Sequence, residues 1–360
     1  MRFLLAVVSF SLVCGGVLVP RGATAQRLAP VPKGAASTHA PYGSGECGMC
    51  HKNNDPKNPG PALKTGSEMC FGCHDELKTA LKRRKVHSPT KQDCGKCHNP
   101  HNSTHPKLLV DDPGALCGTC HKAITRKATT SKVGHAPMTQ GKKCLTCHNA
   151  HASGIDHLLI RLPFDLCVEC HSKDGMKSKD GKKLTNFKKH LDENKEWHAP
   201  VAGKDCSACH TPHGGDKFRL LTAEYPPEFY SPYEPKNYKL CFDCHNPEIL
   251  ASPRTRTLTR FRDGDRNLHY LHVNKADRGR TCRACHEVHA SRQPNHIRDG
   301  VPYGPKGWIL KVVYKKTPTG GTCEKTCHAG APYNNGGGGK ARGATKAAAA
   351  PKPAAAPKGK

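Results

Sequence analysis

Ten cysteine pairs in this chain are each closed by a histidine directly after the second cysteine. Nine have the form Cys-x-x-Cys-His, and the tenth has one more residue between its cysteines. Two thiols at this spacing can form thioether bonds to the vinyl groups of one haem, and the adjoining histidine can then bind the iron. The motifs predict covalent haem c on 20 of the 21 cysteines: Cys47, Cys50, Cys70, Cys73, Cys94, Cys97, Cys117, Cys120, Cys144, Cys147, Cys167, Cys170, Cys206, Cys209, Cys241, Cys244, Cys282, Cys285, Cys323 and Cys327.

Two other uses of paired cysteines explain the pattern less well. Structural zinc also binds Cys-x-x-Cys pairs, but it needs four ligands and no histidine after every second cysteine. A disulfide places no demand on the residue that follows it. Histidine makes up 24 of 360 residues, so ten consecutive matches favour haem over both alternatives.

The histidine of each motif is the predicted proximal ligand of its haem iron. These residues are His51, His74, His98, His121, His148, His171, His210, His245, His286 and His328. The last belongs to the Cys323–Cys327 motif, which departs from the common pattern because three residues separate its cysteines.

A repeat in the sequence suggests where the distal ligands come from. Five units of two motifs cover residues of about 39–74, 87–121, 135–171, 198–245 and 272–328. Each unit opens with a histidine, usually in His-Ala/Ser-Pro, and in units two to five the first motif extends to Cys-x-x-Cys-His-x-x-His. Because these positions recur, we predict that they supply nine distal ligands: His39, His87, His101, His135, His151, His198, His213, His272 and His289. The tenth is one of His105, His157, His190, His269 and His296, and the sequence does not choose among them.

Iron ligated by two histidines has no free position for a substrate. The histidines of this chain are numerous enough to close every site, and we assign no catalytic residue. The expected activity is therefore outer-sphere electron transfer between closely spaced haems.

The two ends of the chain differ from the region with the motifs. Residues 1–25 combine Arg2, a short apolar run and Ala23-Thr24-Ala25, which is typical of a signal peptide and predicts an exported protein. Residues 26–330 form the predicted decahaem domain. Residues 331–360 are rich in Lys, Ala and Pro and are expected to be a disordered basic tail, which could dock anionic lipid, polysaccharide or an acidic protein.

The formal charge is +28 with a pI of about 9.5. Such a charge would ordinarily suggest nucleic acid as a partner. The propionates of ten haems would offset most of it, so we do not expect nucleic-acid binding.

The composition predicts a fold with little regular structure. Gly and Pro number 35 and 29, and only 6% of residues are aromatic. We expect a mostly irregular chain with short α-helices, little or no sheet, and five two-haem repeats packed around a core of haem. Residues 222–239 and 299–322 lengthen the last two units and are expected to be surface loops.

The segment Trp197–His213, with its relatives Cys94–His101 and Cys144–His151, resembles the doubled CXXCH multihaem cytochromes. Ten such motifs behind a signal peptide are most similar to the decahaem cytochromes of outer-membrane porin–cytochrome conduits, the MtrA, PioA and DmsE type. This resemblance implies a haem wire held partly within a β-barrel porin, which passes electrons between the periplasm, redox protein partners and an outer-surface cytochrome. It implies a role in extracellular respiration or iron oxidation and reduction. A freely diffusing or extracellular multihaem cytochrome is the alternative within the same motif family.

Two other functions stay open at this point. One is a multihaem oxidoreductase that acts on a small nitrogen or sulfur compound at one open haem, for which the irregular tenth motif is the natural place. The other is a cationic binding module that uses the basic tail, and it is compatible with electron transfer.

Overall fold

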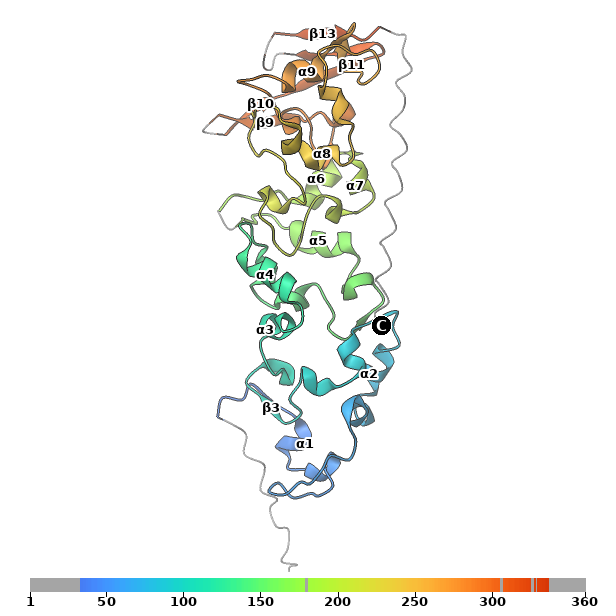
Figure 1. Ribbon diagram of the computed structural model, residues 1–360, viewed down its shortest axis with the longest axis vertical. Helices are drawn as coiled ribbons and strands as arrows, with labels where there is room; N and C mark the ends of the chain where they lie inside the picture. The colour runs from blue at the N-terminus through green and yellow to red at the C-terminus, as the bar shows by residue number, and fades with distance from the viewer. Residues whose placement is uncertain (1–32, 179–180, 305–306, 325–326, 328, 337–360) are drawn as a thin grey trace, which may run out of the picture.

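The protein is an elongated body in which position along the long axis follows the order of the chain (Figure 1). The computed structural model describes residues 33–178, 181–304, 307–324, 327 and 329–336. Helix α1 lies near one end and strand β13 at the other (Figure 1). The predicted signal peptide, His328 and most of the predicted tail lie outside the described residues.

The helices are short, as the Gly and Pro content predicts. They are α1 (Ala40–Gly43), α2 (Asp75–Ala80), α3 (Pro113–Gly118), α4 (Lys122–Thr130), α5 (Pro163–His171), α6 (Phe187–Glu193), α7 (Ala199–Ala202), α8 (Lys239–Phe242) and α9 (Leu268–Val273). Single 3-10 turns fill much of the remaining chain, and six of them contain motif cysteines: Cys47–Met49, Gly66–Gly72, Cys94–Lys96, Lys143–Thr146, Cys206–Ala208 and Cys282–Ala284. The other 3-10 turns are Ser88–Lys91, Pro106–Leu108, Ala136–Met138, Asp156–Leu158, Phe218–Leu220, Pro235–Tyr238, Pro247–Leu250 and Pro294–His296.

The His-Ala/Ser-Pro sequence that opens a unit also starts a helical turn. His39 and His198 are the N-cap residues of α1 and α7, and each has proline in the first turn of the helix. His87 and His135 precede 3-10 turns with proline in the same place. Proline suits this place because its fixed φ fits a helix and its missing N–H would have no partner there. The motif therefore holds the unit-opening histidine at a fixed point, just before a turn.

The strands form six small antiparallel sheets. They are β1 (Ser37–Thr38), β2 (Lys85–Val86), β3 (Asn102–Ser103), β4 (Ala152–Ser153), β5 (Glu196–Trp197), β6 (Arg262–Asp263), β7 (Arg266–Asn267), β8 (Ala290–Ser291), β9 (Gly300–Tyr303), β10 (Trp308–Lys311), β11 (Val313–Thr317), β12 (Gly320–Glu324) and β13 (Ala331–Asn334). The pairs are β1–β3, β2–β4, β5–β8, β6–β7 and β9–β10, and β11, β12 and β13 form a three-stranded sheet in that order.

Three of the two-residue sheets connect neighbouring units. β1–β3, β2–β4 and β5–β8 each place the strand before a unit-opening histidine beside the strand after the extra histidine of a later first motif. A single bridge between Val133 and Gly215 takes this place for the unit that opens at His135. Consecutive units are thereby tied together through their backbones.

The C-terminal part of the described chain departs from the expectation of little or no sheet. Residues 299–322, expected as a surface loop, contain β9, β10 and β11 and most of β12. Ala331–Asn334, placed in the predicted tail, form β13 and pair with β12. The composition of this region, rich in Gly, Pro and Lys, concealed short runs of β-branched and aromatic residues that favour strands.

Residues 222–239 were also expected to be a surface loop, and half of them are exposed, but two of their tyrosines are not. Tyr225 and Tyr238 are 6% and 0% exposed, and their rings meet edge to face with centroids 5.9 Å apart. Aromatic rings bury a large apolar area when they pack in this way. The segment therefore contributes two aromatic side chains to the interior while its other residues are mostly at the surface.

The interior holds few large apolar side chains. Among the described residues, the large side chains that are less than 2% exposed are Tyr238, Leu250 and Asn267. A continuous cavity of about 5910 Å³ is lined by residues from His39 to Asn335, including the motif cysteines and histidines in the described part of the chain. The centre of the body is therefore surrounded by potential haem ligands. In the described ranges, no helix is both long and apolar enough to cross a membrane.

Candidate haem sites

Each regular motif is wound into one helical turn. The backbone N–H of the motif histidine donates to the carbonyl oxygen of the first cysteine, as from His51 to Cys47 at 2.9 Å and from His245 to Cys241 at 2.8 Å. This bond is the i to i−4 bond of an α-helix, which brings residues four positions apart to one side. The turn therefore presents two thiols and one imidazole to the same space.

The imidazole rings of the motif histidines lie opposite other histidines throughout the described body. In each pair the ring centroids are 6.0–6.4 Å apart and the ring planes differ by 7–30°. The pairs are His74–His39, His51–His101, His121–His87, His98–His151, His171–His135, His148–His213, His245–His198, His210–His289 and His286–His269.

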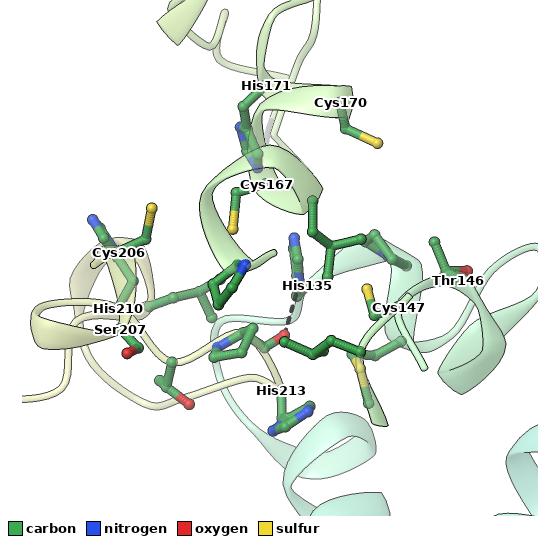
Figure 2. A pocket seen from close by; sticks show the side chains of 18 of the residues that line it. His135, Thr146, Cys147, Cys167, Cys170, His171, Cys206, Ser207, His210 and His213 are labelled. Carbon is green, nitrogen blue, oxygen red and sulfur yellow. Dashed lines mark hydrogen bonds between the residues drawn. The ribbon is translucent and has the colours of Figure 1, made fainter. Parts of the chain in front are cut away.

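This separation fits one iron between two imidazoles. A metal–imidazole nitrogen bond is about 2 Å long, so two such bonds on opposite sides of one ion place the ring centres roughly 6 Å apart. Figure 2 shows His171 and His135 pointing toward one another, with Cys167 and Cys170 beside them. The donor set and its spacing therefore suit a haem with two histidine ligands.

A backbone carbonyl orients the first motif histidine of every unit. The Nδ1 atom lies within 2.7–3.0 Å of the carbonyl oxygen nine residues later, and the pairs are His51–Gly60, His98–Lys107, His148–His157, His210–Arg219 and His286–Asn295. An Nδ1–H that donates to a carbonyl leaves the lone pair on Nε2, which is then free to bind a metal.

The acceptor carbonyl is presented by a backbone turn of unusual conformation. In units two to five the acceptor residue and its successor both have positive φ: Lys107 and Leu108, His157 and Leu158, Arg219 and Leu220, and Asn295 and His296. In unit one the acceptor is Gly60, with φ of +70°. Non-glycine residues rarely adopt this region, and strained backbone is retained where surrounding structure requires it. The same strained turn at four places indicates that the carbonyl direction matters.

Several of the predicted distal histidines have their Nδ1 atoms fixed in the same way. Nδ1 of His87 lies 3.0 Å from the Ala150 carbonyl oxygen, and that of His135 lies 2.7 Å from the oxygen of Pro212. Both contacts reach into the next unit. The link between units thus also sets the ring orientation.

Burial favours the neutral form of many of these rings. It lowers the pKa of His101, His151, His171, His198, His210, His213 and His286, and it lowers the pKa of His289 to about 4 and of His269 to about 3. In each case desolvation of the charged form is the largest cause. Neutral imidazole is the form that binds metal.

The motifs follow one another in space in chain order. The side chains of Cys70 and Cys94 lie close enough to interact, although they belong to consecutive motifs of different units. The same contact joins Cys117 to Cys144, Cys167 to Cys206 and Cys241 to Cys282. These four contacts therefore place the second motif of a unit beside the first motif of the next unit.

Four segments of the chain match the family model of the doubled CXXCH motif, namely residues 39–79, 87–126, 135–176 and 198–249. The chain carries doubled CXXCH motifs. Such motifs imply covalently bound haem c and support a multihaem c-type cytochrome that transfers electrons. The matched segments correspond to the first four predicted units, and residues 272–328 lie outside them. None of the curated proteins with which the chain was compared matches it.

The five histidines proposed from the sequence as candidates for the tenth distal ligand occupy different places. His269 lies opposite His286 and has its Nδ1 atom 2.9 Å from Oγ1 of Thr259. His296 packs edge to face on His198, and Nε2 of His190 is buried without a hydrogen-bond partner. His105 lies 3.9 Å from Asp111, and the carbonyl of His157 serves as an acceptor for His148. His269 has the arrangement of a tenth distal ligand.

The last of the motifs differs in its local structure. Cys323 lies in strand β12, whereas the other first cysteines lie in helical turns. Cys327 is exposed, and its neighbour His328 lies outside the described residues. His272, the predicted distal ligand that remains, has its Nδ1 atom 2.7 Å from the Leu268 carbonyl oxygen and its ring beside Phe261.

The described ranges contain neither a disulfide between motif cysteines nor a cluster of side chains that could bind zinc. The same residues contain no cluster of three or more His, Cys, Asp or Glu side chains that could hold a metal ion by themselves. Structural zinc needs such a cluster.

Sequence reasoning missed the groups that orient the imidazoles. The acceptors for Nδ1 are mostly backbone carbonyls, which residue type does not reveal. The signal that could have found them is the constant spacing of nine residues after the first motif histidine. Thr259 had no such signal because it lies outside the repeated pattern.

Proposed function

We propose that the chain is an exported decahaem c-type cytochrome that conducts electrons by outer-sphere transfer along haems with two histidine ligands. The observation that carries this proposal is the set of nine near-parallel imidazole pairs with centroids 6.0–6.4 Å apart. The pairs all involve a motif histidine, so each couples a covalent attachment point to a second ligand.

The proposed ligand set follows from these pairs. A unit-opening histidine is the distal ligand of the haem attached at the second motif of its own unit. His39, for example, lies opposite the proximal ligand His74. The extra histidine of a first motif is the distal ligand of the haem attached at the first motif of the preceding unit. His101, for example, lies opposite the proximal ligand His51. The fifth unit has no successor to supply such a histidine, and His269 takes its place opposite His286. His272 is then left for His328.

Closed coordination determines what the sites can do. Bound haem supplies one-electron exchange, and imidazole on both faces keeps substrates from the metal. The motif cysteines hold consecutive sites next to one another, and the contacts between Cys117 and Cys144 and between Cys167 and Cys206 continue the row across unit boundaries. The chain thereby favours passage of electrons from one end of the body to the other.

EPR of the oxidised, full-length protein, combined with its mass, tests this proposal. The expected result is a mass increase of ten haems and only low-spin ferric signals. A high-spin signal of about one haem would instead favour an oxidoreductase with one open site, and the tenth site is where to look because Cys323 lies in a strand. A protein matured with the attachment machinery that still has the mass of bare polypeptide contradicts both functions.

Export and placement at the outer membrane are part of the same proposal. Residues 1–25 have the pattern of a signal peptide, and the elongated row of sites suits transfer over a distance (Figure 1). The partners we propose are redox proteins, including a β-barrel porin and an outer-surface cytochrome. Co-purification with a barrel protein in detergent is the expected result. Recovery as a stable soluble monomer from the periplasm contradicts the porin assignment and leaves electron transfer untouched.

A further inference from the structure

The fifth unit contains an ion pair in its interior. Nη2 of Arg298 donates to Oε2 of Glu287 at 2.8 Å, and the two side chains are only 13% and 16% exposed. Nη1 of Arg298 donates to the carbonyl oxygen of Arg283 at 2.7 Å. The guanidinium is thus held between a carboxylate and a backbone acceptor.

The matching positions in the other units are occupied differently. The backbone N–H of Arg298 donates to the carbonyl of Cys285, and the same bond is made to the matching cysteine by Leu63, Val110, Ile160 and Thr222. Glu287 follows its motif histidine directly, where the other three extended motifs have Asn99, Asn149 and Thr211. A common backbone frame therefore carries neutral residues in units two to four and opposite charges in unit five.

The stability of the fold does not explain this exchange. Removing two charges from water costs several kcal/mol per ion, and apolar residues of similar volume often stabilise a protein as well or better. Apolar or neutral side chains fill the position of Arg298 in the other units without difficulty. The pair therefore points to a role for the charge of Glu287 itself.

The second carboxylate oxygen of Glu287 faces a predicted haem ligand. Oε1 lies 3.8 Å from Nδ1 of His289, whose ring is paired with His210. This distance is an electrostatic contact and is longer than a hydrogen bond. By contrast, Nδ1 of His87 and of His135 face neutral backbone carbonyls.

We propose that Glu287, held in place by Arg298, lowers the reduction potential of the haem attached at Cys206 and Cys209 through its distal ligand His289. This inference rests on the proposed function. The negative charge of the carboxylate, 3.8 Å from Nδ1, stabilises the ferric state of this haem relative to the ferrous state. Glu287 acts through His289 and is a positioning and tuning residue. The seventh haem of the row becomes harder to reduce than its counterpart held by His148 and His213.

The test is Glu287→Gln in the full-length holoprotein, followed by EPR-monitored redox titration. The expected result is that one low-spin signal moves to higher potential and changes its g-values while the other signals stay in place. Glu193→Gln is the matched control, because Glu193 also pairs with an arginine, Arg292, at 3.3 Å, but its side chain is 46% exposed. The control should leave every potential unchanged.

A second pair of variants makes the outcome decisive. Because Glu287→Gln leaves the Arg298 charge buried and unpaired, the double variant Glu287→Gln with Arg298→Met removes both charges. It should still show an upward shift of the same signal, smaller than in Glu287→Gln because the positive charge of Arg298 is lost as well. His289→Met identifies the haem, since the signal that moves in Glu287→Gln must be the one that changes ligation here. The inference is overturned if the Gln variants keep ten low-spin haems with unaltered potentials, or if the shifted signal is a different haem. Missing haem or high-spin signals in the unmodified protein would count against the proposed function instead.

Discussion

The backbone N–H of His39 donates a hydrogen bond to the carbonyl oxygen of His101 at 2.9 Å. The same bond runs from His87 to His151 at 2.9 Å and from His198 to His289 at 3.0 Å. Each bond joins two predicted distal ligands that come from neighbouring units and lie opposite the two motif histidines of one unit. A shift of one unit against the next would therefore displace two iron ligands together, and this coupling gives the row of sites a fixed geometry.

Replacing His269 tests the proposed tenth distal ligand. His269→Ala should convert one haem to the high-spin form, because its ring is paired with His286 and no other described imidazole is paired with that residue. EPR of the oxidised protein measures the change. His105→Ala serves as the control and should leave all haems low-spin, since His105 lies near Asp111 and outside the paired rings. A high-spin signal in the His105 variant alone would reverse the assignment.

The repeat predicted the kinds of ligand, but their partners could not be deduced from it. A first motif histidine such as His51 takes its partner, His101, from the following unit, because β1 and β3 bring these segments together. Pairing over such a distance leaves no local trace in the sequence. The sequence did not single out His269 for a further reason. This residue lies on α9 three residues before His272, and only His272 matches the repeated position.

Fold prediction succeeded where local chemistry dominates. The short turns followed from Gly, Pro and the His-Ala/Ser-Pro motif, whereas β9–β13 depend on pairing between segments with no distinctive composition. Tyr225 and Tyr238 were assigned to a loop because proline surrounds them, yet burial of their rings determines their place. Tertiary packing overrode local composition in both cases.

The strained turn predicts different responses to glycine at two matched positions. Arg219 has φ of 51°, a region that costs an ordinary residue about 1–2 kcal/mol. Arg219→Gly should therefore raise the free energy of unfolding by about 0.5–1 kcal/mol after the added freedom of the unfolded chain is deducted. Asn295→Gly should change it little, because asparagine tolerates its φ of 58°. Guanidinium unfolding of the holoproteins measures both, and a gain only at Asn295 would contradict the strain argument.

A buried serine after the extra histidine should be important for stability. Oγ of Ser153 donates to the Leu159 carbonyl at 2.6 Å and accepts from the N–H of Ile155 at 3.0 Å. Ser153 is only 5% exposed. Ser153→Ala leaves two backbone groups without this partner, which costs about 1–3 kcal/mol. Chemical denaturation should show this loss, while Ser44→Ala, at an exposed hydrogen bond, should be close to neutral. Equal effects in the two variants would remove the special role of the buried site.

Asp112 should make stability depend on pH in the acid range. Its carboxylate accepts from Lys143 and from the N–H of Gly114 at the start of α3, and these contacts lower its pKa below the ordinary value of about 4. The folded state therefore binds a proton less readily than the unfolded state. The stabilisation is fully present above the ordinary pKa and is lost as pH falls through the folded-state value. Unfolding midpoints measured between neutral pH and about pH 2 should fall less steeply for Asp112→Asn than for the unmodified protein. If the midpoints of the two proteins fall equally steeply with pH, the contact of Asp112 with Lys143 does not contribute to stability.

The irregular last motif leads to a prediction about haem number. Cys323 lies in β12, where its backbone pairs with Tyr314 and Ala331, so the strand holds this cysteine without help from a helical turn. Cys323→Ser with Cys327→Ser should therefore remove the mass of one haem and leave the other nine low-spin. Cys47→Ser with Cys50→Ser is the comparison at the opposite end of the body and should also remove one haem. If the double variant at the last motif keeps the mass of the unmodified protein, that motif holds no haem, and the row ends at the site of Cys282 and Cys285.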